Sequence, residues 1–229
     1  MKISAVTNVI IITMLILLGI VANNYTYTTT TTMAMSPIYV GNTTTNKASL
    51  MINVYWGNEY ISPMLKILKD NNIKTTFFIG GTWANKYPEL LQEIVNNGHE
   101  IGNHGFFHKD SDKLSLQCVT QEIESNHKLI KALVGVDMNL FAPPSGAYNS
   151  TTMQACENLR YKAIMWTYDT IDWRDQVNSL IISRATKKIA SGNLILMHPT
   201  KCTLDSLQQI IDKYKANNIQ LTTVSQTIQ

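Results

Sequence analysis

The chain has 229 residues and a formal net charge of +3, and charged residues make up only 15% of the sequence. This length suits one α/β domain with an extension. The low charge and the lack of a basic run exclude nucleic acid as an expected partner, because phosphate binding needs clustered Lys and Arg.

The N-terminal segment 1–22 predicts export. Val9–Ala22 is almost wholly apolar, and after Lys2 the next charged residue is Lys47. The apolar run is short for a membrane-spanning helix, which needs about 20 residues, and it suits a signal peptide. The neutral residues before the run leave an uncleaved membrane anchor open as the alternative. In either case Lys2 predicts that the rest of the chain is extracellular, in the cell wall or membrane-anchored.

A Thr-rich segment, residues 23–48, follows and is uncharged up to Lys47. Its low complexity predicts a tether rather than a packed element. The folded domain is therefore expected over residues 49–229.

Short apolar runs alternate with amphipathic segments through this domain, which predicts an α/β fold with parallel strands. We expect strands at Leu50–Val54, Thr75–Ile79, Ile101–Asn103, Leu140–Ala142, Ala163–Thr167, Leu194–Met197 and Gln220–Val224. We expect helices around Ile61–Leu68, Leu90–Val95, Leu116–Leu133, Met153–Leu159, Val177–Ile189 and Leu204–Tyr214. This pattern indicates an incomplete, distorted (β/α) barrel of about seven parallel strands, with a doubly wound open sheet as the alternative.

Residues of chemical interest follow the ends of these strands, where both folds place an active site. They are Tyr55, Trp56, His104, His108, Ser145, Asp169, Asp172, Trp173 and His198. His104 and His108, four residues apart, can converge on one metal ion, although a pair of surface histidines has the same spacing. Asp172 can fix the tautomer of His198 and raise its basicity, although a capping aspartate and a structural histidine are the simpler alternative.

Four stretches resemble, in order, four of the five motifs of the polysaccharide deacetylases, the NodB-homology family of carbohydrate esterases. They are GHEIGNHGFFH, FAPPSG, DTIDW and LMH. The resemblance implies a distorted barrel of parallel strands that removes acetyl groups from N-acetylglucosamine or N-acetylmuramic acid units of peptidoglycan or chitin-like polymers. INVYWGNEY and FAPPSG also resemble a divergent, sporulation-associated branch of the family.

The resemblance also implies roles for individual residues. In the family, an Asp-His-His triad binds a divalent metal, usually zinc, and a neighbouring aspartate acts as the base. His104 and His108 correspond to metal ligands, His198 to the general acid that protonates the leaving amine, and Asp172 to the carboxylate that tunes it. Zinc or another divalent metal is therefore the cofactor that the family implies.

The first family motif, T-F-D-D-G, is altered in this chain. Tyr55 stands where the family has its base, and Trp56 stands where it has its metal ligand. An indole has no lone pair for a metal, and a phenol is a poor base at neutral pH. The arginine and tyrosine of the third motif are replaced by Ala142 and Ser145. The sequence therefore predicts that deacetylation is reduced or lost.

Three interpretations follow. In one, the domain binds cell-wall glycan without catalysis, and Tyr55, Trp56, Trp173 and Ser145 bind the sugar. In another, it remains a metal hydrolase with Glu59, or less favourably Asp110 or Cys202, as a substitute third ligand. The alternative for Glu59 is an acidic residue in the first turn of a helix, which the helix dipole favours. In the third, the chain is a structural or interaction protein of the cell wall or spore envelope.

Overall fold

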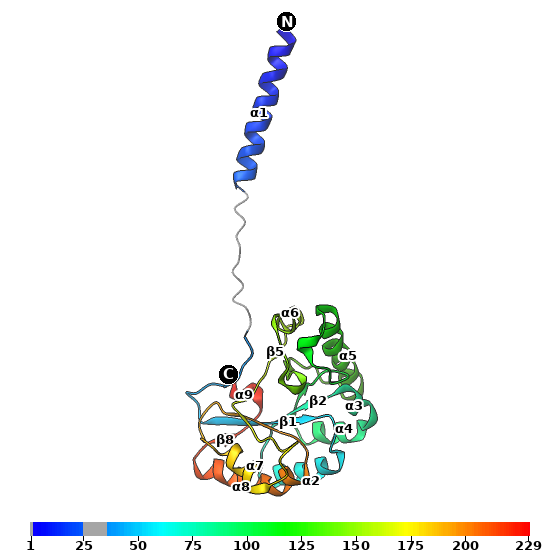
Figure 1. Ribbon diagram of the computed structural model, residues 1–229, viewed down its shortest axis with the longest axis vertical. Coiled ribbons are helices and arrows are strands. Elements are labelled where there is room, and N and C mark those ends of the chain that lie inside the picture. Colours follow the sequence, from blue (N-terminus) through cyan, green and yellow to red (C-terminus); the bar gives the residue numbers. More distant parts are fainter. Residues whose placement is uncertain (1, 25–35) are drawn as a thin grey trace. The chain divides into compact units, whose positions relative to one another are not determined.

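The computed structural model describes residues 2–24 and 36–229, and it divides the chain into two units, Met1–Ala34 and Met35–Gln229 (Figure 1). The first unit contains helix α1 (Lys2–Asn24), which covers the apolar run of the N-terminal segment. In the described part of the chain, no helix combines the length and the apolar character that crossing a membrane requires. The role of segment 1–22 as a signal peptide or anchor stays a prediction.

The second unit is built on a sheet in which all strand pairs are parallel. The strand order is β5-β4-β3-β2-β1-β7-β6, and β8 pairs with β1 outside this path. This order confirms the expected distorted barrel of about seven parallel strands. The strands are β1 (Lys47–Val54), β2 (Thr76–Ile79), β3 (Glu100–Asn103), β4 (Leu140–Phe141), β5 (Lys162–Ala163), β6 (Tyr168–Asp169), β7 (Leu194–Met197) and β8 (Gln220–Leu221).

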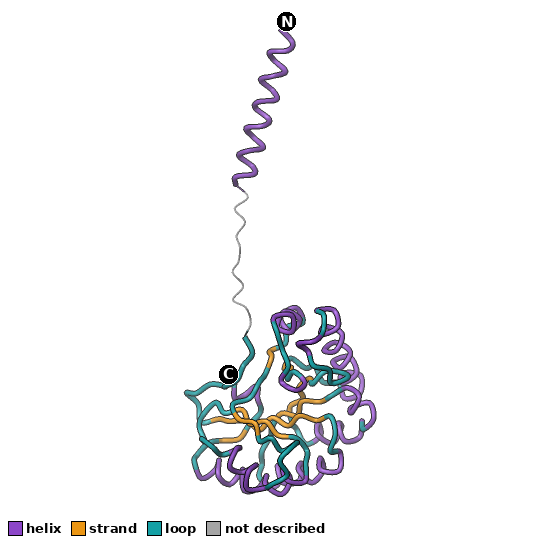
Figure 2. Tube along the Cα trace, in the orientation of Figure 1, coloured by secondary structure: helices purple, strands orange, loops and turns teal. Residues whose placement is uncertain are grey.

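Most helices cover the outside of the strands, as Figures 1 and 2 show. They are α2 (Asn58–Asp70), α3 (Gly81–Lys86), α4 (Pro88–Asn96), α5 (Leu116–Val134), α6 (Ser150–Asn158), α7 (Asn178–Ala185), α8 (Lys201–Ala216) and α9 (Val224–Thr227). α2 buries Ile61, Met64, Leu65 and Leu68, which is the apolar stripe expected at helical spacing.

Capping residues set several helix boundaries. The Ser115 hydroxyl accepts a hydrogen bond from the Cys118 amide at the start of α5, and Gly135, with a φ of 74°, ends that helix. Thr200 caps α8 in the same way, so this helix begins before the expected Leu204. Thr223 caps α9, which is why the last strand ends at Leu221 instead of continuing to Val224.

The expected strand Ala163–Thr167 is wrong beyond its first residue, because only Ala163 belongs to a strand. β5 ends at Ala163, β6 begins at Tyr168, and these two strands lie at opposite ends of the strand order. Ile38 fills the place between them: its amide donates to the Ala163 carbonyl at 2.9 Å, and its carbonyl accepts from the Met165 amide at 2.8 Å. The barrel is thus closed in part by a segment that precedes β1.

This closing segment corrects the expected domain boundary at residue 49. The compact unit begins at Met35, and residues 38–42 are hydrogen-bonded to it. Gly41 donates to the Gly192 carbonyl at 2.7 Å, for example. Backbone pairing of this kind leaves no trace in composition, which is why a Thr-rich, uncharged stretch resembles a tether. Residues 25–35 of the expected tether lie outside the described residues.

Candidate functional site

Strand alternation directs the site residues into the mouth of the barrel. On β1, Met51 packs inside the barrel, so Asn53, two residues later, lies on the same inner face. On β7, Leu194 packs inside, and Leu196 and His198 follow with the same parity. Because the strands are parallel, their carboxyl ends bring these side chains to one rim.

A cavity of about 390 Å³ lies at this rim. The sequence-predicted residues that line it are Tyr55, Trp56, His104, His108, Ser145, Trp173 and His198. The cavity thus unites residues that follow five different expected strands. Asp172 lies beneath His198 and is fully buried, whereas Glu59 is not among the lining residues.

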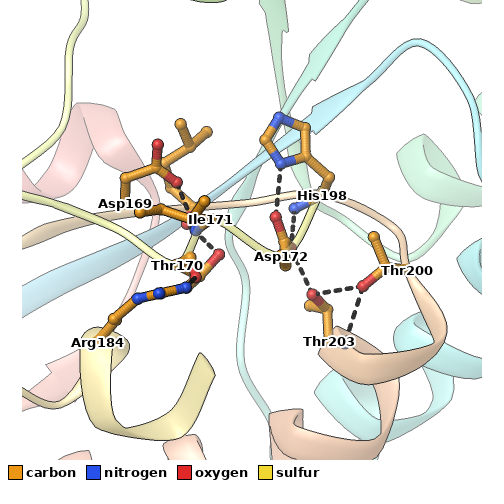
Figure 3. A network of polar contacts seen from close by, with 9 residues as sticks. Asp169, Thr170, Ile171, Asp172, Arg184, His198, Thr200 and Thr203 are labelled. Carbon is orange, nitrogen blue, oxygen red and sulfur yellow. Dashed lines mark hydrogen bonds and ion pairs between the residues drawn. The ribbon is translucent and has the colours of Figure 1, made fainter. Parts of the chain in front are cut away.

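Asp172 and His198 form the pair expected from the sequence (Figure 3). One carboxylate oxygen of Asp172 lies 2.8 Å from Nδ1 of His198, and the other accepts from the His198 backbone amide at 2.6 Å. The Thr203 hydroxyl also donates to the second oxygen. Because Nδ1 carries the proton toward Asp172, Nε2 of His198 is the nitrogen available to the cavity.

His104 and His108 also meet in the cavity, with ring centroids 4.9 Å apart. His108 has a left-handed backbone conformation, with a φ of 56°, in the turn that brings its side chain back toward His104. Burial lowers the pKa of His104 to about 3, and burial also lowers the pKa of His108. Nδ1 of His104 donates to the Ala142 carbonyl at 2.7 Å, so its Nε2 keeps a free lone pair.

Each of the two aromatic substitutes lies against a histidine of the site. The Trp56 ring stacks on His198, with centroids 5.7 Å apart and planes 11° apart. The Tyr55 ring lies 4.5 Å from the His108 ring, and its hydroxyl donates to the Phe107 carbonyl at 3.3 Å. Gly80 leaves room for Tyr55, because a Cβ at that position would lie 2.5 Å from the phenol ring.

These residues do not make up a catalytic zinc centre, which usually has three protein ligands and a water. Within residues 2–24 and 36–229, no group of three His, Cys, Asp or Glu side chains is arranged to hold a metal. Glu59 is exposed in the first turn of α2, the position that the helix dipole favours for an acid. Asp110 pairs with Lys113 at 2.7 Å, and Cys202 lies in α8. In the described structure, none of these three side chains therefore completes a metal site with His104 and His108.

Several residues of the cavity were not expected from the sequence as binding residues. They are Asn53, Gly146, Trp166, Asp169 and Leu196. Asp169 is the first aspartate of DTIDW, and the motif offered a signal for it. Gly146 leaves room for Trp166, because a Cβ there would lie 2.5 Å from the indole. Asn53 and Trp166 carried no signal, since only the closed barrel determines which side chains reach its mouth.

Comparison with known proteins places this geometry in a family. The polysaccharide deacetylase family model matches residues 40–164. The uncharacterized protein YlxY of Bacillus subtilis is 38% identical over 190 residues, which cover 83% of this chain and 60% of YlxY. A peptidoglycan-N-acetylglucosamine deacetylase of Bacillus cereus is 27% identical over 176 residues, covering 75% of this chain and 64% of that enzyme. The chain thus spans a little under two thirds of each relative.

Solved structures show the same fold. A CE4 family pseudoenzyme from Bacillus anthracis has a TM-score of 0.82 and 32% identity, with 85% of this chain and 69% of that chain covered. The peptidoglycan deacetylase PdaC of Bacillus subtilis has a TM-score of 0.73 and 27% identity, with 79% and 89% covered. The family model, the relatives and the shared barrel together show that this chain belongs to the polysaccharide deacetylase family.

Proposed function

We propose that this protein binds cell-wall glycan in the cavity and that its deacetylase activity is reduced or lost. The observation that carries the proposal is the position of the two aromatic rings, Trp56 on His198 and Tyr55 beside His108. In the sequence motif these rings replace the two carboxylates on which the family reaction depends. An indole has no lone pair to give a metal, and a phenol is a poor base at neutral pH.

The loss of activity follows from the chemistry of amide hydrolysis. The reaction needs an activated water and a positive centre that stabilises the oxyanion. The family's deacetylases are generally metal-dependent, and the side chains of this cavity do not assemble three metal ligands. His198 and Asp172 keep the arrangement of an acid and its partner, but this pair acts only after water has attacked the amide carbonyl.

Relatives support this interpretation. The similar Bacillus anthracis protein is described as a pseudoenzyme, and a mutant of it, 31% identical to this chain with a TM-score of 0.82, is described as having restored enzymatic activity. Loss of activity on this scaffold is therefore compatible with an intact barrel.

The aromatic lining supports glycan as the ligand. Trp56 is 42% exposed and Trp173 is 53% exposed, and both line the cavity. Exposed tryptophans of this kind mark binding surfaces, and the apolar face of a sugar ring packs well on an indole. Ser145 adds a hydroxyl at the same cavity. Relatives named as peptidoglycan deacetylases make peptidoglycan the favoured glycan, with a chitin-like polymer as the alternative.

Peptidoglycan as the proposed ligand also implies where the protein is located. Peptidoglycan lies outside the cytoplasmic membrane, so binding it requires export, for which segment 1–22 is the candidate signal peptide or anchor. A role in the spore envelope is the narrower form of the same proposal and rests on the resemblance of INVYWGNEY and FAPPSG to a sporulation-associated branch.

Two measurements on the same preparation test the proposal. Sedimentation with purified peptidoglycan should show binding that Trp56→Ala weakens and that Leu133→Ala, an exposed apolar control on α5, leaves intact. Zinc-supplemented assays on an N-acetylglucosamine oligomer should show no turnover above the blank. Turnover that disappears in both His104→Ala and His198→Ala would overturn the proposed loss of activity. Binding that survives Trp56→Ala unchanged would refute glycan binding in this cavity.

A further inference from the structure

The cavity offers a ligand many hydrogen-bond acceptors and no permanent cation. Among the described residues that line it, none is Lys or Arg. Asn53 is only 4% exposed, and its side-chain oxygen is buried without a hydrogen-bond partner in the described structure. The free Nε2 of His104 is a second acceptor. Unpaired buried acceptors of this kind cost free energy until a donor reaches them.

Asp169 adds a carboxylate to the same cavity. One of its oxygens accepts from the Ile171 amide at 2.7 Å, and in Figure 3 its side chain extends to the same side as the His198 ring. No ion pair to Asp169 is present within residues 36–229. The neighbouring Arg184 instead donates to the Thr170 carbonyl at 3.0 Å and pairs with Asp175 at 2.6 Å. Burial raises the pKa of Asp169, whereas the charges of His198 and Arg184 act in the opposite direction.

Four aromatic rings line the same cavity, and Arg174 already lies 5.8 Å from the centroid of one of them, Trp173. Tyr55, Trp56, Trp166 and Trp173 all line the cavity. The negative face of an aromatic ring attracts a cation, tryptophan most strongly, and the attraction grows when the cation is partly removed from water. A carboxylate, free lone pairs and several indoles in one cavity are the chemical complement of a small organic cation that carries N–H donors.

We propose that the cavity recognises the free ammonium group of a de-N-acetylated hexosamine unit, as in a glucosamine-containing glycan, in preference to the N-acetylated unit. This inference rests on the proposed glycan-binding function and specifies its ligand. An ammonium group brings a positive charge and three N–H donors for acceptors such as Asp169 and His104. An acetamide is neutral, brings one N–H donor, and adds a carbonyl oxygen for which the lining offers no cationic partner.

The preference also assigns the protein a place in a reaction sequence. A glycan with free amines is the product of amide hydrolysis on an N-acetylated glycan, so an N-deacetylation must supply this ligand. The protein would then bind what a catalytic deacetylase has already modified.

Calorimetric titration of the full-length chain, with a chelator present, tests the preference. The probes are β-1,4-linked tetramers of glucosamine, N-acetylglucosamine and glucose. The glucose tetramer carries a hydroxyl in place of the amine of the glucosamine tetramer. The glucosamine tetramer should bind at least about tenfold more tightly than either neutral tetramer. Asp169→Asn should reduce this preference to within about twofold, whereas Asp70→Asn, an exposed carboxylate at the end of α2, should preserve it.

The outcomes separate the inference from the function on which it rests. Equal or tighter binding of a neutral tetramer overturns the ammonium preference, as does a preference that persists in folded Asp169→Asn. Comparison of the three tetramers on the unaltered chain decides the matter even if that variant does not fold. If none of the tetramers and no peptidoglycan binds, glycan binding itself is refuted.

Discussion

The indole of Trp56 lies nearly parallel to the imidazole of His198, with 5.7 Å between the ring centroids. The two residues come from opposite ends of the domain sequence, at the carboxyl ends of the adjacent strands β1 and β7. His198 is paired with the buried Asp172, and the Tyr55 ring lies beside His108. Under the proposed function, the acid side of the site is kept and rings replace the base and metal side. This division makes specific predictions possible.

Trp56→Asp should create a metal site. The new carboxylate would stand in the motif position of the family's metal ligand, near His104 and His108, and would complete three ligands. Zinc affinity should rise by at least about tenfold over the unaltered chain, measured by titration against a chromophoric chelator. Trp56→Ala is the matched control, since it opens the same space without a carboxylate. Equal zinc affinities in the two variants would contradict the prediction.

Asp172→Ala should destabilise the domain. Asp172 is fully buried and binds the His198 ring, the His198 amide and the Thr203 hydroxyl, so its removal leaves these donors without a partner. The free energy of unfolding should fall by about 2–4 kcal/mol in urea denaturation. Asp205→Ala on the exposed side of α8 should cost less than about 1 kcal/mol, since its ion pair with Lys201 is solvated. Comparable losses in the two variants would show that the buried network contributes little.

His99 should make the domain sensitive to mild acid. Its ring is buried, and burial lowers its pKa to about 4, below the ordinary value of about 6.5. Between these values the unfolded chain binds a proton that the folded chain does not. The contribution of His99 to stability is therefore complete above about pH 6.5 and decreases by about 1.4 kcal/mol per pH unit as the pH falls toward about 4.

The variant that checks this slope is His99→Gln, because glutamine can still accept the hydrogen bond that the Thr75 amide donates to His99 at 3.2 Å. Urea unfolding across this pH range should show a slope shallower by about 1.4 kcal/mol per pH unit in the variant. His127→Gln, which replaces a partly exposed histidine, is the control. An unchanged slope in His99→Gln would mean that His99 is protonated in the folded state.

The segment before β1 should stabilise the barrel. Ile38→Pro removes the amide that donates to Ala163 at the open edge between β5 and β6. The free energy of unfolding should decrease by about 1–3 kcal/mol, because the sheet loses a donor at that edge. Val40→Pro is the control, since no backbone hydrogen bond from the Val40 amide is present in the described structure. If both substitutions lower the free energy of unfolding equally, the hydrogen bond from the Ile38 amide does not explain the loss.

Much of the architecture was predictable because its signals are local. Apolar runs at strand spacing and stripes at helical spacing identified most of the strands and helices, as in α2. The polar residues after successive strands had to share a rim, because parallel strands have their carboxyl ends on one side. The sequence therefore predicts that His104, His108 and His198 lie at one rim.

Sequence alone thus indicated the family and the order of most strands along the chain, and it predicts that Tyr55 and Trp56 replace two carboxylates. Tertiary structure alone decided that Glu59 stays outside the cavity, that Ile38 closes the barrel, and that Asn53 and Trp166 line its mouth. The physical reason is the range of the interactions involved. Periodicity records which face of its own segment a residue occupies, whereas the neighbours on that face depend on how every other strand and helix closes around it.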